Sequence, residues 1–390
     1  MLVKMARIAT PEQIAAVEDK LHGLGYKTGK MVGEEITLIG AYGDITRLPQ
    51  GEIQEMGGVE TLIPISRSYK RAAQKGSPGS LIHNIVNIGK VEVGGDKLTV
   101  VAGPCSVESE PQIMEAARLV KESGARVLRG GVVKYRSSPY SGWEGIGSNS
   151  EEALRNGLKL IVKAGKEFGL PTVVEVLDPY DVSVYEDIGV DCIQVGEPNS
   201  KNQALLNRLR DTPLPVIHKR GNSLDIEAYL LWVERVMANG KENVILCERG
   251  ILSANKYTRN TLDLGGIAAL HYQLSCLPVG VDASHGTGIR DLVHSMTLAG
   301  IMAGASLVLI EAHPNPLIAK SDGFQGLFPE QLTQLVIACE QVWELRKRID
   351  SLYIPSANLE GDYDGRAATD RKRLFGREEK SNRGASEQGD

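Results

Sequence analysis

The chain has 390 residues, enough for two to three domains, and its 42 % hydrophobic and 24 % charged residues are ordinary for a soluble globular protein. Its 44 basic and 49 acidic residues give a net charge of −5, so we expect no nucleic-acid partner. No apolar run reaches about 18 residues and the N-terminus has no apolar signal-peptide core, which excludes a membrane protein and makes the cytoplasm the expected location.

The first 65 residues have the pattern of a small α+β domain. An apolar strand at 1–8 precedes Thr10-Pro11-Glu12, in which a capping residue is followed by proline at the first helical position. The helix is expected to end at Gly23 or Gly25, and the further predicted elements are strands at 28–32, 35–41 and 59–64 and a short helix at 50–56. The order β-α-β-β-α-β is that of a ferredoxin-like, ACT-like module. We expect a regulatory domain at 1–65, the alternative being a plain dimerisation or packing module.

Residues 66–97 are predicted to form a linker and a hairpin. The run Gly76-Ser77-Pro78-Gly79-Ser80 is typical of a loop, and the hairpin is expected at 88–93, before Gly94-Gly95.

Eight apolar runs follow, most of them separated by segments of helical periodicity such as 112–120. These runs lie at 98–103, 127–131, 172–176, 192–196, 215–219, 243–248, 278–282 and 306–311. Strands that alternate with helices pair in parallel, and eight such units over about 250 residues predict an α/β fold, a (β/α)8 TIM barrel at 98–355. An open doubly wound sheet is the alternative, which we disfavour because no Gly-x-Gly-x-x-Gly turn follows the first strand.

The segment 356–390 is predicted to be a polar, disordered tail. Its part from 361 onward contains one Leu, one Phe and no Ile or Val. Such a segment buries too little apolar surface to offset the entropy lost on ordering.

Polar residues follow nearly every predicted barrel strand, at the end where TIM-barrel active sites lie. Six of these residues form a cationic set, and guanidinium and ammonium groups in one cavity indicate phosphorylated substrates. The set consists of Arg129, Lys134, Arg136, Lys219 and Arg249, with Arg290 as a further candidate. Salt bridges to neighbouring acids are the alternative for any one of them.

A second set of strand-end residues has the donor groups of a metal site. It consists of Cys105, His285, Glu311 and Asp322, with Glu248, Asp282 and His313 nearby in the sequence. A thiol, an imidazole and carboxylates suit a divalent transition metal better than magnesium or calcium. The alternative is a buried cysteine and a loop histidine with no ligand role. Five widely spaced cysteines, an odd number, predict reduced thiols in either case.

Motifs on all the barrel strands resemble those of 3-deoxy-D-arabino-heptulosonate 7-phosphate (DAHP) synthases. The resemblance covers about residues 70–350, in the branch related to 3-deoxy-D-manno-octulosonate 8-phosphate synthase that carries an N-terminal ferredoxin-like regulatory domain. The motifs are Ala102-Gly103-Pro104-Cys105-Ser106, Leu128-Arg129-Gly130-Gly131, Lys134-Tyr135-Arg136-Ser137-Ser138-Pro139-Tyr140, His218-Lys219-Arg220-Gly221, Leu246-Cys247-Glu248-Arg249-Gly250, Thr258-Arg259-Asn260-Thr261-Leu262-Asp263, Asp282-Ala283-Ser284-His285, Glu311-Ala312-His313-Pro314 and Ser321-Asp322-Gly323.

The resemblance implies a metal-dependent condensation of phosphoenolpyruvate with erythrose 4-phosphate, which opens the shikimate route to aromatic amino acids. We also expect a homo-oligomer, either a dimer or a tetramer, and an aromatic amino acid as effector of the N-terminal module. The implied metal ligands are Cys105, His285, Glu311 and Asp322, for Mn, Fe, Co or Zn. The implied substrate-binding residues are Arg129, Lys134, Lys219 and Arg249 for phosphoenolpyruvate and Arg136 with Ser137 for the acceptor phosphate. The implied catalytic residues are Lys134, Glu175, Asp282 and His285.

Two departures from the family pattern bear on the acceptor. Tyr135 stands where the family loop usually has proline, and Glu197-Pro198-Asn199 stands where relatives commonly have Ala-Arg-Asn. Tyr135 either points away from the cavity, the outcome we favour, or reshapes the acceptor site. The alternative functions are a sister synthase for another aldose phosphate, a Schiff-base aldolase with Lys219 as nucleophile, and a non-catalytic regulatory relative.

Overall fold

The computed structural model describes residues 1–33, 36–43, 48–63, 68–74, 83–136, 140 and 143–352. The chain forms two compact units that divide between Lys70 and Arg71. The tail predicted at 356–390, the loop from Gly76 to Ser80 and the predicted substrate-binding residue Ser137 lie outside the described residues.

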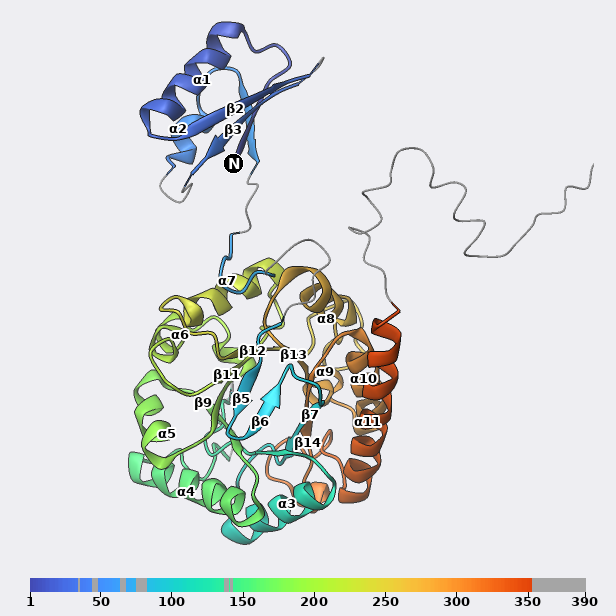
Figure 1. Cartoon of the computed structure of the whole chain (residues 1–390). Coiled ribbons are helices and arrows are strands. Elements are labelled where there is room, and N and C mark those ends of the chain that lie inside the picture. The colour runs from blue at the N-terminus through green and yellow to red at the C-terminus, as the bar shows by residue number, and fades with distance from the viewer. Residues whose placement is uncertain are drawn as a thin grey trace, which may run out of the picture. The chain divides into compact units, whose positions relative to one another are not determined.

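The first unit is a four-stranded antiparallel sheet with two helices, and the predicted ferredoxin-like fold is confirmed (Figure 1). Its strands have the order β2-β3-β1-β4. Its elements are β1 (Leu2–Met5), α1 (Pro11–Gly23), β2 (Lys27–Val32), β3 (Thr37–Tyr42), α2 (Gln50–Gln54) and β4 (Val59–Ile63). The Thr10 hydroxyl accepts from the backbone N–H of Gln13, and the Gln13 side chain accepts from the N–H of Thr10, so α1 begins with a capping box.

The core of this unit lies on one face of the sheet. Val3 and Met5 of β1 alternate toward the helices and are fully buried. They pack with Val17 and Leu21 of α1 and Ile53 of α2 in one cluster. This unit therefore has a hydrophobic core of its own.

The second unit is a closed barrel of eight parallel strands, as predicted, which excludes the open doubly wound sheet. Around the ring the strands have the order β10-β11-β12-β13-β14-β7-β8-β9. Their bounds are β7 (Thr99–Gly103), β8 (Val127–Arg129), β9 (Thr172–Val176), β10 (Cys192–Val195), β11 (Val216–Lys219), β12 (Val244–Glu248), β13 (Val279–Val281) and β14 (Leu307–Glu311).

Helices surround the barrel (Figure 1). They are α3 (Glu110–Glu122), α4 (Glu151–Phe168), α5 (Val182–Ile188), α6 (Gln203–Leu209), α7 (Ile226–Met237), α8 (Leu264–Ala269), the short α9 (Ala283–Thr287), α10 (Arg290–Ala303) and α11 (Pro329–Asp350). Helix α4 illustrates their construction, since Leu154, Leu158 and Ile161 recur at helical spacing and are buried. Ser150 caps its first turn, and Gly169 ends it in the left-handed conformation.

A hairpin of β5 (Val86–Ile88) and β6 (Val91–Val93) closes one end of the barrel. Its four valine and isoleucine side chains share a buried cluster with Val127, Cys192 and Leu307, which are the first residues of three barrel strands. The plugged end is thus the N-terminal one. The hairpin was predicted at 88–93, but its turn lies at Gly89, whose φ of +54° favours glycine, so its first strand begins earlier.

All five cysteines are buried free thiols, in agreement with the predicted reduced state. Among the described residues, no helix is long and apolar enough to cross a membrane.

Candidate active site

A cavity of about 420 Å³ opens among the loops that follow the C-terminal ends of the barrel strands. Its lining is mostly charged, with cations and carboxylates contributed by the ends of several strands. The lining residues are Lys134, Tyr135, Arg136, Glu175, Gln194, Gly196, Glu197, Pro198, Lys219, Arg249, Arg259, His285 and Asp322.

Three of the predicted metal ligands meet beside this cavity. The ligand atoms of Cys105, Glu311 and Asp322 all lie within 4.8 Å of one another. Cys105 Sγ donates to Asp322 Oδ2 over 2.9 Å, and the fourth predicted ligand, His285, places Nε2 3.4 Å from Glu311 Oε1. One thiol, one imidazole and two carboxylates thus converge, the donor set that borderline divalent transition metals prefer.

In this cluster the pKa of the Cys105 thiol is raised, whereas the pKa of the Asp322 carboxyl is lowered. Burial, and the neighbouring Glu311 carboxylate, raise the pKa of the Cys105 thiol to about 12. Burial alone would raise the pKa of Asp322, but His285 and the hydrogen bond from Cys105 hold that pKa well below its usual value. The raised pKa keeps the thiol protonated and the lowered pKa keeps Asp322 ionised, so a divalent cation that binds here displaces the thiol proton.

The backbone at Asp322 is held in an unusual conformation. Asp322 has a φ of +54°, the one positive value at a described residue other than glycine, and such a conformation costs about 1 kcal/mol. Arg290 secures the turn that follows, since its guanidinium donates to the carbonyl oxygens of Gly323 and Gly326. Arg290 is thus occupied by backbone and does not line the cavity, so its assignment to the cationic set is wrong.

Asp282 holds two of the site's basic groups at once. Its Oδ2 accepts from Lys219 Nζ over 2.6 Å and lies 2.7 Å from His285 Nδ1. A carboxylate accepts only, so His285 carries its proton on Nδ1 and turns Nε2 toward the metal cluster. Burial would raise the pKa of the Asp282 carboxyl, but His285 and Lys219 hold it well below its ordinary value.

Most cations at the site have a carboxylate partner. Arg129 donates to Glu311 over 2.9 Å, and both side chains are almost completely buried. Lys134 Nζ lies 3.7 Å from Glu175 Oε2. Arg259 lies 3.4 Å from Asp322. These pairs account for the charge of each of the three cations.

Two cations have no carboxylate partner among the residues that the structure describes. Arg249 is only 4 % exposed, and its buried Nε has no hydrogen-bond partner. Arg136 donates to neutral groups, the carbonyl oxygen of Trp143 over 2.8 Å and the hydroxyl of Ser321 over 3.1 Å. Both line the same cavity. A guanidinium without a counter-charge can bind an anion, and two of the described residues that line the cavity are of this kind.

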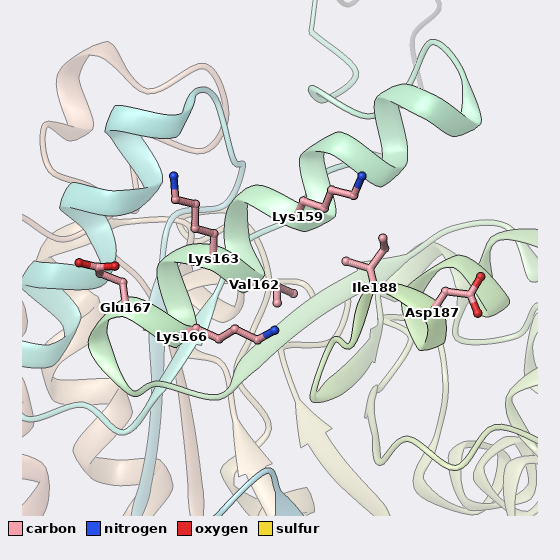
Figure 2. A pocket seen from close by; sticks show the side chains of 7 residues that line it. All are labelled: Lys159, Val162, Lys163, Lys166, Glu167, Asp187 and Ile188. Carbon is pink, nitrogen blue, oxygen red and sulfur yellow. The ribbon is translucent and has the colours of Figure 1, made fainter.

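A second groove, of about 540 Å³, lies outside the barrel between α4 and the end of α5 (Figure 2). Lys159, Lys163 and Lys166 of α4 lie on one side of it and Asp187 and Ile188 of α5 on the other. None of the predicted catalytic, substrate-binding or metal-ligating residues lines this groove. We therefore take the cavity at the strand ends as the candidate active site.

Two family models match the chain and together cover most of it. Residues 72–351 match the DAHP synthetase I family, and residues 1–67 match the DAHP synthase ferredoxin-like domain. The chain belongs to the DAHP synthetase I family. The predicted resemblance to DAHP synthases is thereby confirmed.

Similar proteins extend the likeness over both units. A phospho-2-dehydro-3-deoxyheptonate aldolase of Thermotoga maritima is 36 % identical over 355 residues, which cover 90 % of this chain and 98 % of the relative. A 2-dehydro-3-deoxyphosphooctonate aldolase of Protochlamydia amoebophila is 27 % identical and covers 64 % of this chain and 93 % of the relative. The crystal structure of a Thermotoga maritima DAHP synthase matches with a TM-score of 0.76 at 34 % identity, over 90 % of this chain and 97 % of that one. A truncated form of the Thermotoga maritima enzyme matches with a TM-score of 0.59 at 35 % identity, over 70 % of this chain and 94 % of that one.

Several strand-end residues do not join the cavity of this DAHP synthase barrel. Glu248 pairs with Arg220 over 2.9 Å, and His313 accepts from the backbone of Asn315. Tyr135 does line the cavity with about half of its side chain exposed, so the favoured prediction that it points away is wrong. The sequence shows that Tyr135 replaces proline but not where the ring turns, because a non-proline residue leaves φ of that loop unfixed.

Three contacts at the candidate site were not predicted from the sequence. Gly196 borders the carboxylate of Glu175 so closely that a Cβ there would lie 1.8 Å from Glu175 Oε1. Gln325 donates to Glu311, and Ser321 contacts Cys105. The sequence holds one signal for two of these residues, because Ser321 and Gln325 are close to the predicted metal ligand Asp322. Their residue types give no signal, because serine and glutamine are common in polar loops.

Proposed function

We propose that this chain condenses phosphoenolpyruvate with erythrose 4-phosphate to give DAHP and inorganic phosphate, the first step of the shikimate pathway. One observation carries the proposal: Arg249 and Arg136, which have no carboxylate partner among the described residues, line the same cavity as His285 and Asp322 of the metal cluster. Two phosphorylated substrates provide the anions that these guanidinium groups lack. Membership of the DAHP synthetase I family agrees with this reading of the charges.

The donor substrate and the acceptor use different cations. Phosphoenolpyruvate, with its carboxylate and phosphate, is bound by Lys134, Lys219 and Arg249, which line the cavity, and by the buried Arg129, which ends strand β8. Arg136, together with Ser137, binds the acceptor phosphate. Burial alone would lower the pKa of the Lys134 ammonium, but Cys105 and Glu175 beside it raise that pKa above its ordinary value, so Lys134 stays charged.

A divalent transition metal fits the four ligands Cys105, His285, Glu311 and Asp322, because a thiol and an imidazole accompany the carboxylates. Mn, Fe, Co or Zn is the expected ion, which when bound acts as a Lewis acid toward the acceptor aldehyde. In the reaction, C3 of phosphoenolpyruvate forms a bond to the aldehyde carbon while the aldehyde C=O π bond opens, and the aldehyde oxygen takes up a proton to become a hydroxyl. Water adds to C2 with loss of a proton, and the C2–O bond to phosphate then breaks as the new C2 hydroxyl loses its proton and becomes the ketone. Glu175 accepts a proton from that water, and Asp282 keeps His285 in the tautomer that presents Nε2 to the cluster.

The acceptor end of the cavity supports a second candidate, a sister synthase that uses another aldose phosphate. Tyr135 and Glu197 both line the cavity, and Glu197 accepts from the backbone N–H of Asn222 over 3.3 Å rather than from a cation. A ring and a carboxylate at the acceptor end change its shape and charge relative to the usual family loop. We keep erythrose 4-phosphate as the proposed acceptor because Arg136 is present and unpaired by any described carboxylate.

The decisive experiment measures phosphoenolpyruvate consumption and phosphate release with erythrose 4-phosphate, arabinose 5-phosphate and ribose 5-phosphate in parallel. We expect turnover with erythrose 4-phosphate, its loss on removal of metal with a strong chelator, and its return with manganese or cobalt. Cys105→Ala is expected to abolish metal binding and turnover while the protein stays folded by circular dichroism. Turnover of a longer aldose phosphate alone would establish the sister synthase. Full activity of a demonstrably metal-free sample would overturn the metal site.

We also propose a role for the first unit. A ferredoxin-like module in the same chain as a biosynthetic barrel is suited to bind an end product, here an aromatic amino acid, and so to regulate the enzyme. A homo-oligomer, dimer or tetramer, in the cytoplasm is the proposed working form.

A further inference from the structure

The hydroxyl of Ser321 lies at a junction between the acceptor-binding loop and the metal cluster. It is 3.1 Å from a guanidinium nitrogen of Arg136, 3.2 Å from Asp322 Oδ2 and 3.4 Å from Cys105 Sγ. The side chain is only 8 % exposed, so water does not readily replace these contacts. One small buried group thus contacts a substrate-binding cation and two metal ligands.

The chemistry of the neighbours fixes the direction of these hydrogen bonds. A guanidinium only donates, and an ionised carboxylate only accepts. Ser321 therefore accepts from Arg136 and donates its single proton to Asp322, which makes a continuous chain from the guanidinium to the metal-binding carboxylate. Such a chain polarises each of its bonds in the same direction.

The other side of Arg136 is tied to the cluster as well. Its Nε donates to the carbonyl oxygen of Trp143, and the indole N–H of Trp143 donates to the hydroxyl of Ser106 over 3.1 Å. Ser106 directly follows the metal ligand Cys105. The guanidinium is therefore anchored at both ends to segments that carry metal ligands, through Ser321 directly and through Trp143 indirectly.

We propose that Ser321 is a positioning residue that couples the acceptor-binding guanidinium of Arg136 to the metal ligands Asp322 and Cys105. The roles at the two ends rest on the proposed function, whereas the coupling itself rests on the contacts of the hydroxyl. Asp322, when it holds the ion, would be fixed in place and would orient the Ser321 hydroxyl and thereby the guanidinium of Arg136. Because coupling is reciprocal, an Arg136 that is fixed in place also strengthens metal binding.

The first test uses the metal alone. Cobalt(II) is titrated into metal-free protein, and the thiolate-to-cobalt absorption band reports binding at Cys105. Ser321→Ala is expected to weaken cobalt binding about 10- to 100-fold and to change the band, while Ser321→Thr, which keeps the hydroxyl, restores both. Ser123→Ala is the matched control, because Ser123 is also buried and its hydroxyl donates to Val120 at the end of α3, away from the site. Cobalt affinity of folded Ser321→Ala within twofold of the unchanged chain would overturn the proposal.

A double-mutant cycle with Arg136→Gln separates coupling from local damage. We expect Arg136→Gln to weaken cobalt binding when Ser321 is present and to have no further effect in Ser321→Ala. Effects that multiply independently, within about twofold, would overturn the coupling. This cycle uses no substrate, so its result is independent of whether the proposed condensation is correct.

The kinetic arm measures both substrates at saturating metal. Ser321→Ala is expected to raise the KM for erythrose 4-phosphate about tenfold and to leave the KM for phosphoenolpyruvate within twofold. Equal increases in both KM values would contradict an effect directed at Arg136. Circular dichroism and thermal unfolding of each variant confirm that folded proteins are being compared.

Discussion

The Glu175 carboxylate can take its position only because residue 196 is a glycine and has no Cβ. A Cβ at 196 would lie 1.8 Å from Glu175 Oε1, far inside van der Waals contact, so the carboxylate must leave its place near Lys134 if any side chain is added. We predict that Gly196→Ala lowers kcat by about 100-fold, the scale of a lost proton-transfer group. Steady-state kinetics measure this. Gly265→Ala is the matched control, since its Cβ would meet only Asp263 at 3.5 Å, and a Gly196→Ala enzyme of normal kcat would show that Glu175 has no such role.

His218 links the stability of the barrel to pH. Its ring is fully buried, with Nε2 3.1 Å from the carbonyl oxygen of Ser200, and burial lowers the pKa of the imidazole to about 4. An unfolded histidine titrates near pH 6.5, so between about pH 6.5 and 4 the unfolded chain binds the extra proton and stability falls as the pH falls. The free energy of unfolding is expected to lose about 2 to 3 kcal/mol from this residue between pH 7 and 4.5.

His218→Gln isolates that contribution because glutamine keeps an N–H donor for Ser200 and has no proton to gain. Urea unfolding of both proteins at pH 7 and pH 4.5 measures it, and the variant should lose less stability on acidification. The comparison is needed because His83 and His271 are partly buried, also have a lowered pKa, and add to the acid sensitivity of both proteins. Equal losses in the two proteins would contradict the assignment.

At the scale of elements, the hairpin of β5 and β6 stabilises the barrel from its N-terminal end. Ile88 is fully buried in the cluster that the hairpin shares with the barrel strands, whereas the neighbouring Asn87 is exposed. Truncation of a buried isoleucine leaves a cavity in addition to the lost transfer free energy. We predict that Ile88→Ala lowers the free energy of unfolding of the barrel by about 2 to 5 kcal/mol, with Asn87→Ala within about 0.5 kcal/mol as control. Urea unfolding monitored by circular dichroism measures both free energies. If the hairpin only lay on the surface, Ile88→Ala and Asn87→Ala would have the same small effect.

The barrel strands were predictable because each is a short, buried, apolar run bounded by loop residues. Strand β9 has the predicted bounds, Thr172–Val176, and the other seven strands fall within their predicted runs. The predicted bounds of the hairpin were wrong because the left-handed turn at Gly89 depends on tertiary contacts, and hydrophobic periodicity carries no information on these.

The sequence predicts which residues lie at the strand ends of the candidate site, but not which of them form ion pairs with one another. Closure of a barrel brings the first and last strands together, so a cluster of Cys105 with Glu311 follows from topology. Topology does not show which cations lack a carboxylate partner. Arg249 and Arg290 both come after strands, yet Arg249 lines the cavity whereas Arg290 binds backbone carbonyl oxygens. Such choices depend on side-chain rotamers and loop geometry, and these are fixed by long-range packing.

On the scale of the whole molecule, the described residues form a separate hydrophobic core in each of the two units. One is the cluster around Val3, Leu21 and Ile53, and the other is the barrel interior with its hairpin. The solved structure of a truncated form of the similar Thermotoga maritima enzyme matches 70 % of this chain. A barrel unit that begins at Arg71 is therefore a reasonable protein to prepare by itself.

This division makes the regulatory proposal testable by deletion. Inhibition requires that the aromatic amino acid bind more tightly to the inhibited state of the chain than to the active one, and the first unit is the proposed source of that difference. We predict that phenylalanine or tyrosine inhibits the full chain, and that the protein starting at Arg71 keeps its turnover and is insensitive to both. Initial rates of phosphate release over a range of amino acid concentrations measure this, with leucine as a non-aromatic control and circular dichroism to verify the truncated fold. Equal inhibition of the two proteins would place the effector site on the barrel, because the deleted unit could then contribute nothing to the difference in affinity.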